Sequence, residues 1–171
     1  DGLMNPDLIE AAITDKTSAI MPTQLNGRVC DMQKIKLIAE KYNLDIYEDS
    51  AQALGASFQG TYAGNFGKGG CISFYPAKVL GCFGDGGAVI CNDDEIYQEL
   101  LLLRDHGRHE NGDVLKWGFN SRLDNLQAAI LNYYFDFYEK TINRRREIAQ
   151  MYFNSLSELK QLTLPPSIEE S

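Results

Sequence analysis

Long apolar runs are absent from this sequence of 171 residues. No stretch approaches the roughly 18 apolar residues that mark a membrane-spanning helix, and no secretory signal pattern is visible, so we expect a cytoplasmic protein without membrane contact. A formal net charge of −8 disfavours a nucleic-acid-binding surface. Internal repeats and low-complexity segments are also lacking. Hydrophobic residues at 44% and charged residues at 23% instead predict an ordinary soluble protein with a sizeable core.

Cysteine and histidine are scarce. The four cysteines show no CxxC spacing, and the two histidines, His106 and His109, lie in one polar segment, so we predict no metal site. Unpaired thiols fit a reducing cytoplasm. We expect Cys71 and Cys91 to be buried in strands and Cys82 to be partly exposed.

A lysine in an unusual setting is the most informative feature present. Lys78 lies in the segment CISFYPAKVLGCFGDGGAV, where an apolar strand leads through Ser73 to a turn at Pro76. Lysine is normally solvated, and an amine removed from water loses its proton more easily and can form a Schiff base with a carbonyl. The glycines that follow let the backbone approach a ligand closely: Gly81, Gly84, Gly86 and Gly87. Taken alone, this segment leaves open a plain strand-to-loop turn whose lysine reaches solvent.

A second segment, LDIYEDSAQALGA, places carboxylates at a strand end. We predict a strand over Leu44–Tyr47 that ends in Glu48 and Asp49. Because ligands of open α/β sheets bind at the carboxyl ends of strands, Asp49 is a candidate cofactor-binding residue. The alternative is that Asp49 or Ser50 caps a short helix. Gln52, one helical turn further on, is then expected to face the same way as Asp49.

The rest of the pattern alternates strands and helices. A strand over Ser18–Met21, a helix over Met32–Tyr42 capped by Asp31, and the strand at Leu44 form a parallel crossover unit. We also expect a short helix over 6–13, a hairpin or irregular loop over 57–66, strands over 72–75 and 87–91, a helix over 95–103, a loop over 104–115 and helical structure from 123 to about 159. On that last helix the arginines are expected to form a solvated face, with binding of an anionic substrate as the alternative: Arg144, Arg145 and Arg146.

Several separate blocks, in a fixed order, carry a family resemblance. They are Asp49 to Gln52, Ser73 to Lys78, the turn Gly84 to Gly87, and GFNSRLDNLQAAIL at 118–131. Together they resemble the pyridoxal-phosphate sugar aminotransferases of the DegT/StrS family, within fold type I. The resemblance implies an α/β fold with a mixed, mostly parallel sheet and flanking helices. By this resemblance, the chain is the central part of the large, cofactor-binding domain, followed by the long helix that leads to the small domain.

The resemblance also implies a role for each candidate residue. Lys78 is the catalytic residue, which binds pyridoxal 5'-phosphate covalently and then moves a proton between cofactor and substrate. Asp49 pairs with the pyridine nitrogen and keeps it protonated, so that the ring withdraws electrons. Gln52 hydrogen-bonds the ring hydroxyl, and Ser73 contacts the phosphate. Two further residues are implied at a site shared between subunits, where one reaches the phosphate of the neighbouring cofactor and the other meets an acidic substrate group: Asn120 and Arg122.

By the same resemblance, this chain is an internal fragment of an enzyme about twice its length. Residues 1–122 belong to the cofactor domain, 123–160 to the connecting helix or helices, and 161–171 to the start of a small-domain linker. The implied enzyme is a homodimer with shared active sites that aminates a nucleotide-linked keto sugar, with glutamate as donor. The segment FYPAKVLGCFGDGGA resembles the branch that aminates carbon 3, although Ala77 and Val79 depart from it.

Two alternatives remain at this point. One is a sugar dehydratase of the same family, but these carry a histidine where Lys78 stands. The other is a non-catalytic regulatory or scaffold domain that keeps the fold. The complete set of Asp49, Gln52, Ser73 and Lys78 argues against it.

Overall fold

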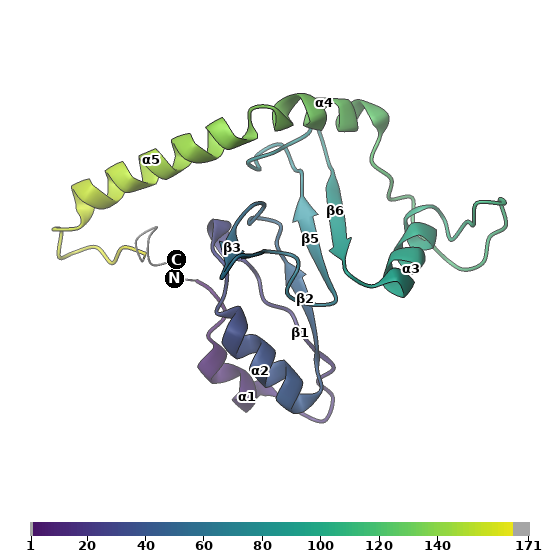
Figure 1. Cartoon of the computed structure of the whole chain (residues 1–171), viewed down its shortest axis with the longest axis horizontal. Coiled ribbons are helices and arrows are strands. Elements are labelled where there is room, and N and C mark those ends of the chain that lie inside the picture. Colours follow the sequence, from purple (N-terminus) through teal and green to yellow (C-terminus); the bar gives the residue numbers. More distant parts are fainter. Residues whose placement is uncertain (1, 166–171) are drawn as a thin grey trace.

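A four-stranded sheet forms the centre of the chain in the computed structural model, which describes residues 2–165. Its strands are β1 (Ala19–Ile20), β2 (Asp45–Asp49), β5 (Gly69–Ser73) and β6 (Gly87–Cys91), in the order β1-β2-β5-β6. The pairs β1–β2 and β2–β5 are parallel, and β6 runs antiparallel to β5 (Figure 1). The predicted mixed, mostly parallel α/β sheet is therefore confirmed.

The crossover between β1 and β2 also follows the prediction. Helix α2 (Met32–Tyr42) begins where Asp31 Oδ1 accepts a hydrogen bond from the Lys34 amide at 3.1 Å, and it ends at Asn43 in a left-handed conformation. Its apolar side packs on the sheet and forms the main core, whose buried members are Ile20, Cys30, Met32, Ile35, Ala39 and Ile46.

The amino-terminal segment is a 3₁₀ turn, η1 (Pro6–Leu8), followed by the short helix α1 (Ile9–Ala12). Asn5 caps η1 by accepting a hydrogen bond from the Asp7 amide. A second 3₁₀ turn, η2 (Leu25–Gly27), lies in the loop between β1 and α2. Two short strands, β3 (Ser57–Phe58) and β4 (Thr61–Tyr62), form the predicted hairpin.

Strand β5 begins earlier than expected. The sequence predicts a strand over 72–75, but β5 spans Gly69–Ser73. Its first residues are Gly69 and Gly70, and the backbone of another segment lies against the second: a Cβ atom on Gly70 would lie 2.4 Å from Gly64 Cα. The pair looks like a loop in the sequence and is a strand in the structure, where it pairs with β2.

The carboxyl-terminal half is helical. Helix α3 (Asp94–Arg104) follows β6 and is capped by Asp93. The helical stretch predicted from 123 to 159 is two helices, α4 (Asn125–Phe135) and α5 (Tyr138–Leu156). A tertiary contact lies at the break between the two helices. The Tyr138 hydroxyl, at the start of α5, donates a hydrogen bond to the Leu54 carbonyl at 2.7 Å.

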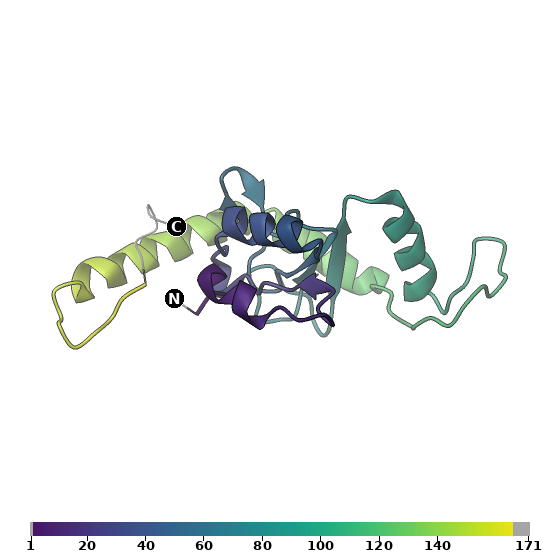
Figure 2. The ribbon, with the colours of Figure 1, turned by 90° about the horizontal axis from the view of Figure 1, so that it is seen from below.

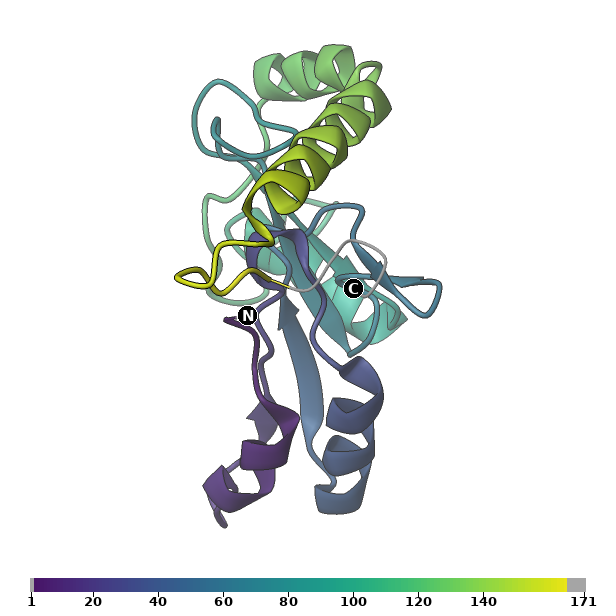
Figure 3. The same ribbon diagram turned by 90° about the vertical axis from the view of Figure 1, so that its left-hand side faces the viewer.

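Helices α4 and α5 lie over the carboxyl ends of β2 and β5, while α1 and α2 lie toward the opposite end of the sheet (Figures 1 and 3). Seen from below, α5 extends to one side of the sheet, and α3 with the loop after it extends to the other (Figure 2). Within residues 2–165, no helix is long and apolar enough to cross a membrane. The last part of the predicted linker, 166–171, lies outside the described residues.

The cysteines differ from their predicted burial. Cys71 is exposed on β5, on the face of the sheet that also carries Asp49 and Ser73, and Cys91 is half-buried. Cys82 is buried instead of partly exposed. Its thiol donates to the carbonyls of Phe74 and Gly84, so it holds the loop that follows Lys78.

Candidate active site

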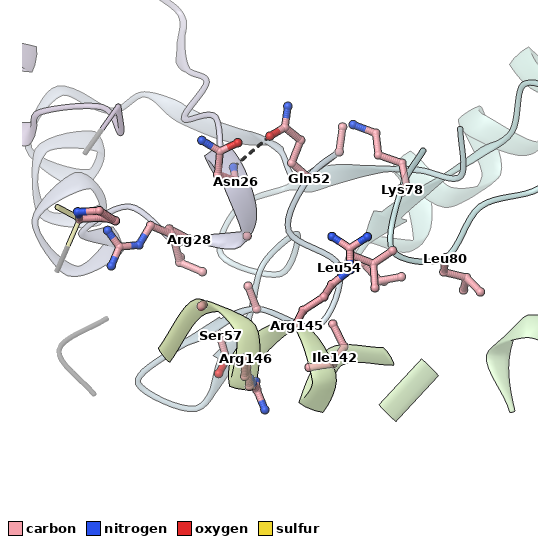
Figure 4. A pocket seen from close by; sticks show the side chains of 18 of the residues that line it. Asn26, Arg28, Gln52, Leu54, Ser57, Lys78, Leu80, Ile142, Arg145 and Arg146 are labelled. Atoms are coloured by element: carbon pink, nitrogen blue, oxygen red, sulfur yellow. Dashed lines mark hydrogen bonds between the residues drawn. The ribbon is translucent and has the colours of Figure 1, made fainter. Parts of the chain in front are cut away.

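A pocket of about 910 Å³ lies between the strand-end loops and α5 (Figure 4). This volume is within the range of about 300–1,000 Å³ that is typical of small-molecule sites. Three of the candidate residues line it together: Gln52, Ser73 and Lys78. They come from different loops and strand ends at the carboxyl edge of the sheet, where ligands of open α/β sheets bind.

Lys78 is half-buried in the loop after β5. Its amide donates to the Tyr75 carbonyl at 2.8 Å, and its side chain extends into the same part of the pocket as Gln52 (Figure 4). Among residues 2–165, the Lys78 Nζ atom has no hydrogen-bond or ion-pair partner. The loop folds back closely at Gly81, where a Cβ atom would lie 2.8 Å from the carbonyl oxygens of Tyr75 and Pro76. A larger residue at this position would push the lysine loop open.

Gln52 is fixed by a loop and not by a helix. No helix follows β2, so the alternative of a helix cap at Asp49 or Ser50 is wrong. Asp49 Oδ1 instead accepts a hydrogen bond from the Ala51 amide at 3.1 Å, which makes a turn. Gln52 Oε1 accepts a hydrogen bond from the Asn26 amide at 3.0 Å, and Asn26 has the left-handed backbone angle φ of 56°. Since its oxygen already accepts this hydrogen bond, the Nε2 amide group of Gln52 is available as a donor to the pocket.

Asp49 ends β2 and is half-buried. In the ladder it pairs with Cys71, and Ser73 lies two residues further along β5, so Asp49 and Ser73 project from the same face of the sheet. The Cys71 thiol donates to Asp49 Oδ1 at 3.7 Å. Partial burial, and then the Asp49 carboxylate, raise the pKa of the Cys71 thiol, so the thiol keeps its proton. Asp49 itself does not line the pocket.

The neighbouring acid, Glu48, serves the architecture. It projects to the opposite face, is 3% exposed, and accepts hydrogen bonds from Gln24 Nε2 at 2.9 Å, the Gly64 amide at 2.9 Å and the Phe66 amide at 2.6 Å. One carboxylate thus ties β2 to the loop before α2 and to the segment before β5. Sequence reasoning grouped Glu48 with Asp49, but the alternation of the strand separates them.

Asn120 and Arg122 lie away from this pocket. Arg122 Nη2 donates to Asn120 Oδ1 at 3.1 Å, and Arg122 Nη1 pairs with Asp105 at 3.2 Å. Neither residue lines the pocket that contains Lys78. A single chain therefore does not bring them together with Lys78.

Positive charge collects in the pocket. Besides Lys78, its lining includes Arg28, Arg145 and Arg146, and it includes no aspartate or glutamate among residues 2–165. Sequence reasoning assigned the arginine run to a solvated face and treated an anion as the alternative. A helical spacing in the sequence would have indicated that two of these arginines lie on the same helix face as apolar residues. This face consists of Ile142, Arg145, Arg146, Ala149 and Phe153.

This combination suits a ligand that carries both an oxyanion and a carbonyl. The arginines and the Ser73 hydroxyl can bind phosphate oxygens. The Lys78 amine can react with a carbonyl, and the Gln52 amine can donate to a nearby ring oxygen.

Comparison with known proteins supplies the decisive observation: all of residues 1–171 match the DegT/DnrJ/EryC1/StrS aminotransferase family. The chain belongs to this family. Its members are PLP-dependent aminotransferases, so the family implies this cofactor.

Individual relatives agree with the assignment. The chain is 42% identical to the UDP-2-acetamido-2-deoxy-3-oxo-D-glucuronate aminotransferase of Pseudomonas aeruginosa, over 91% of this chain and 44% of that protein. It is 47% identical to the dTDP-3-amino-3,6-dideoxy-alpha-D-galactopyranose transaminase of Aneurinibacillus thermoaerophilus, over 90% of this chain and 42% of that protein. A Bacillus subtilis structure with bound cofactor PMP matches with a TM-score of 0.82 and 35% identity, covering 93% of this chain and 36% of that one. The chain thus spans less than half the length of these relatives.

Proposed function

We propose that the protein carrying this chain is a pyridoxal-phosphate-dependent aminotransferase that aminates carbon 3 of a nucleotide-linked keto sugar, with glutamate as the amino donor. The observation that carries the proposal is the half-buried Lys78, whose amine has no partner among residues 2–165 and which lines one pocket with Gln52 and Ser73, within a chain of this family. In this proposal residues 1–122 belong to the cofactor domain, 123–160 connect it to the small domain, and 161–171 begin the linker.

The donor set of the pocket fits this cofactor. When bound, pyridoxal phosphate supplies an aldehyde for attachment and an electron-withdrawing ring. Lys78 Nζ would hold the cofactor covalently, and the freed amine would then be placed to accept and return a proton. Ser73 Oγ would hold the phosphate, and Gln52 Nε2 would hold the ring hydroxyl. The Asp49 carboxylate, at the end of β2 beside the pocket, would keep a proton on the ring nitrogen, and its Oδ1 atom accepts hydrogen bonds from the Ala51 amide and the Cys71 thiol.

The separation of Asn120 from Lys78 supports a homodimer with shared active sites. Asn120 lies outside the pocket of its own chain, on an exposed segment after α3. We propose that it contacts the cofactor phosphate of the neighbouring subunit, and that Arg122 contributes to binding an acidic substrate group there.

Two relatives support the position of amination. The activities in their names differ in the nucleotide, which is UDP in one and dTDP in the other, and in the sugar. Both names place the chemistry at carbon 3. Amination at carbon 3 is therefore the property of these relatives that we most expect this protein to share. The residues around Lys78 agree with it.

Turnover of paired substrates tests this function. The full-length protein is loaded with the cofactor and incubated with glutamate and either the 3-keto or the 4-keto form of one nucleotide sugar. We expect preferential amination of the 3-keto compound. Preferential turnover of the 4-keto compound would overturn the assignment of carbon 3. No turnover of either compound, across both UDP and dTDP sugars, would favour a non-catalytic role.

A further inference from the structure

We propose that Arg145 binds the diphosphate group of the nucleotide sugar; Arg146, next to it in the lining of the same pocket, points away and is not assigned to the diphosphate. The inference rests on the proposed function, because that function supplies a substrate with a diphosphate. It goes beyond it by locating the nucleotide on α5, a helix that holds none of the residues assigned to the cofactor.

The geometry of α5 separates these arginines from their neighbour. Residues along an α-helix turn by about 100° each, so Ile142, Arg145, Ala149 and Phe153 fall on one side and Arg144 falls on the other. The pocket lining follows this division: it includes Arg145 and Arg146 and omits Arg144. Arg144 Nη1 is instead paired with Glu147 at 2.9 Å. Only part of the arginine run therefore belongs to the site.

The direction of Arg145 agrees with its assignment. Figure 4 shows its guanidinium extending from α5 toward Leu54, across the pocket from Gln52 and Lys78, whereas Arg146 points the other way. Neither arginine has a hydrogen-bond or ion-pair partner among residues 2–165. In a chain with a net charge of −8, this pocket attracts anions, because its lining includes Lys78 and Arg145 and, among residues 2–165, no aspartate or glutamate.

A diphosphate fits this arrangement better than a single carboxylate. The planar guanidinium presents paired donors that match phosphate and carboxylate oxygens alike, so the neighbouring surfaces decide between the two. Beyond Arg145, the same face of α5 offers the rings of Tyr152 and Phe153 and the amide of Gln150, which suit a nucleobase. Lys78, near the other side of the pocket, suits the keto sugar. The surfaces suited to the base, the diphosphate and the sugar therefore follow one another along the pocket in the same order as these groups in a nucleotide sugar.

Equilibrium binding of UDP and dTDP to the full-length, cofactor-loaded protein tests this inference. We expect Arg145→Gln to weaken binding of the better ligand by about tenfold or more, because charge-assisted hydrogen bonds are lost. Arg145→Lys should recover part of the affinity, and Arg146→Gln should have a smaller effect. The matched control is Arg144→Gln, which removes an equal charge next to the pocket and should change affinity by less than about twofold.

Further measurements distinguish a diphosphate subsite from a different role of Arg145. Borohydride trapping of the cofactor should be equal in all variants, and a loss confined to Arg145→Gln would assign the arginine to the cofactor and overturn the proposal. Weaker binding of 2-oxoglutarate with unchanged binding of UDP and dTDP would also overturn it, as would equal effects of Arg144→Gln and Arg145→Gln. If the unaltered protein fails to trap the cofactor but still binds the nucleotide through Arg145, the proposed function falls and the subsite stands. Absence of binding of both nucleotides by the unaltered protein would refute the subsite.

Discussion

The buried carboxylate of Glu48 is the support on which the strand end depends, and Glu48→Gln tests this directly. Glu48 Oε2 accepts from Gln24 and Gly64, and Oε1 accepts from Phe66. The amide substitute has nearly the same shape but only one accepting atom. Whichever way the amide turns, its NH₂ group faces at least one N–H donor. The charge that strengthened the remaining hydrogen bonds is also lost.

The expected cost follows from these contacts. Hydrogen bonds to charged groups contribute about 1.5–3 kcal/mol each, and a buried donor left without a partner costs about 1–3 kcal/mol. Since these contributions overlap, we expect the free energy of unfolding to fall by about 3 kcal/mol. With a urea dependence of about 2 kcal/mol/M, the unfolding midpoint should fall by about 1.5 M.

Urea unfolding followed by circular dichroism provides the measurement, with Glu110→Gln as the matched control. Glu110 is exposed, so its substitution makes the same chemical change without the buried contacts. The control should unfold within about 0.3 M of the unaltered protein, as is usual for surface changes. A Glu48→Gln midpoint as close as the control's would refute the supporting role of this carboxylate.

Three further predictions concern the assembly and the cofactor. Mixing an Asn120→Ala variant with a Lys78→Ala variant, each inactive alone, should restore part of the activity through hybrid dimers; no recovery in subunits shown to exchange would contradict shared sites. The 171-residue chain alone should bind pyridoxal phosphate weakly in an absorbance titration, because anchors from the rest of the protein act together with these residues, and tight stoichiometric binding would contradict this. Asp49→Asn should slow the chemical step far more than it lowers stability, since it removes the charge that holds the ring nitrogen protonated; an unchanged rate constant in single-turnover measurements would refute that role.

The sequence predicted the regular elements best where local chemistry is strong. Helix α2 has its cap at Asp31 and a periodic apolar face, and its predicted bounds match the structure. Strand β6 was equally clear. The early start of β5 was missed because Gly69 and Gly70 have no strand propensity of their own. They belong to the strand because they pair with β2 and β6, and at Gly70 only glycine fits against the Gly64 backbone; both are tertiary constraints.

The candidate site was predictable in part. The family resemblance, carried by the order and spacing of the sequence blocks, selected three residues that line one pocket in the structure: Gln52, Ser73 and Lys78. The support of Gln52 by the Asn26 amide was not predictable, since it joins segments 26 residues apart. The different environments of Arg144 and Arg145 also required the structure, because they depend on where α5 breaks from α4 and how it then crosses the strand ends.

Covalent trapping at Lys78 tests the central claim most directly. The full-length protein is mixed with pyridoxal phosphate, reduced with borohydride and digested, and the labelled peptide is identified by mass spectrometry. We predict a visible absorbance band that borohydride removes, and a single label on Lys78 that is absent from Lys78→Ala. A label on another lysine, or equal labelling of Lys78→Ala, would contradict the account.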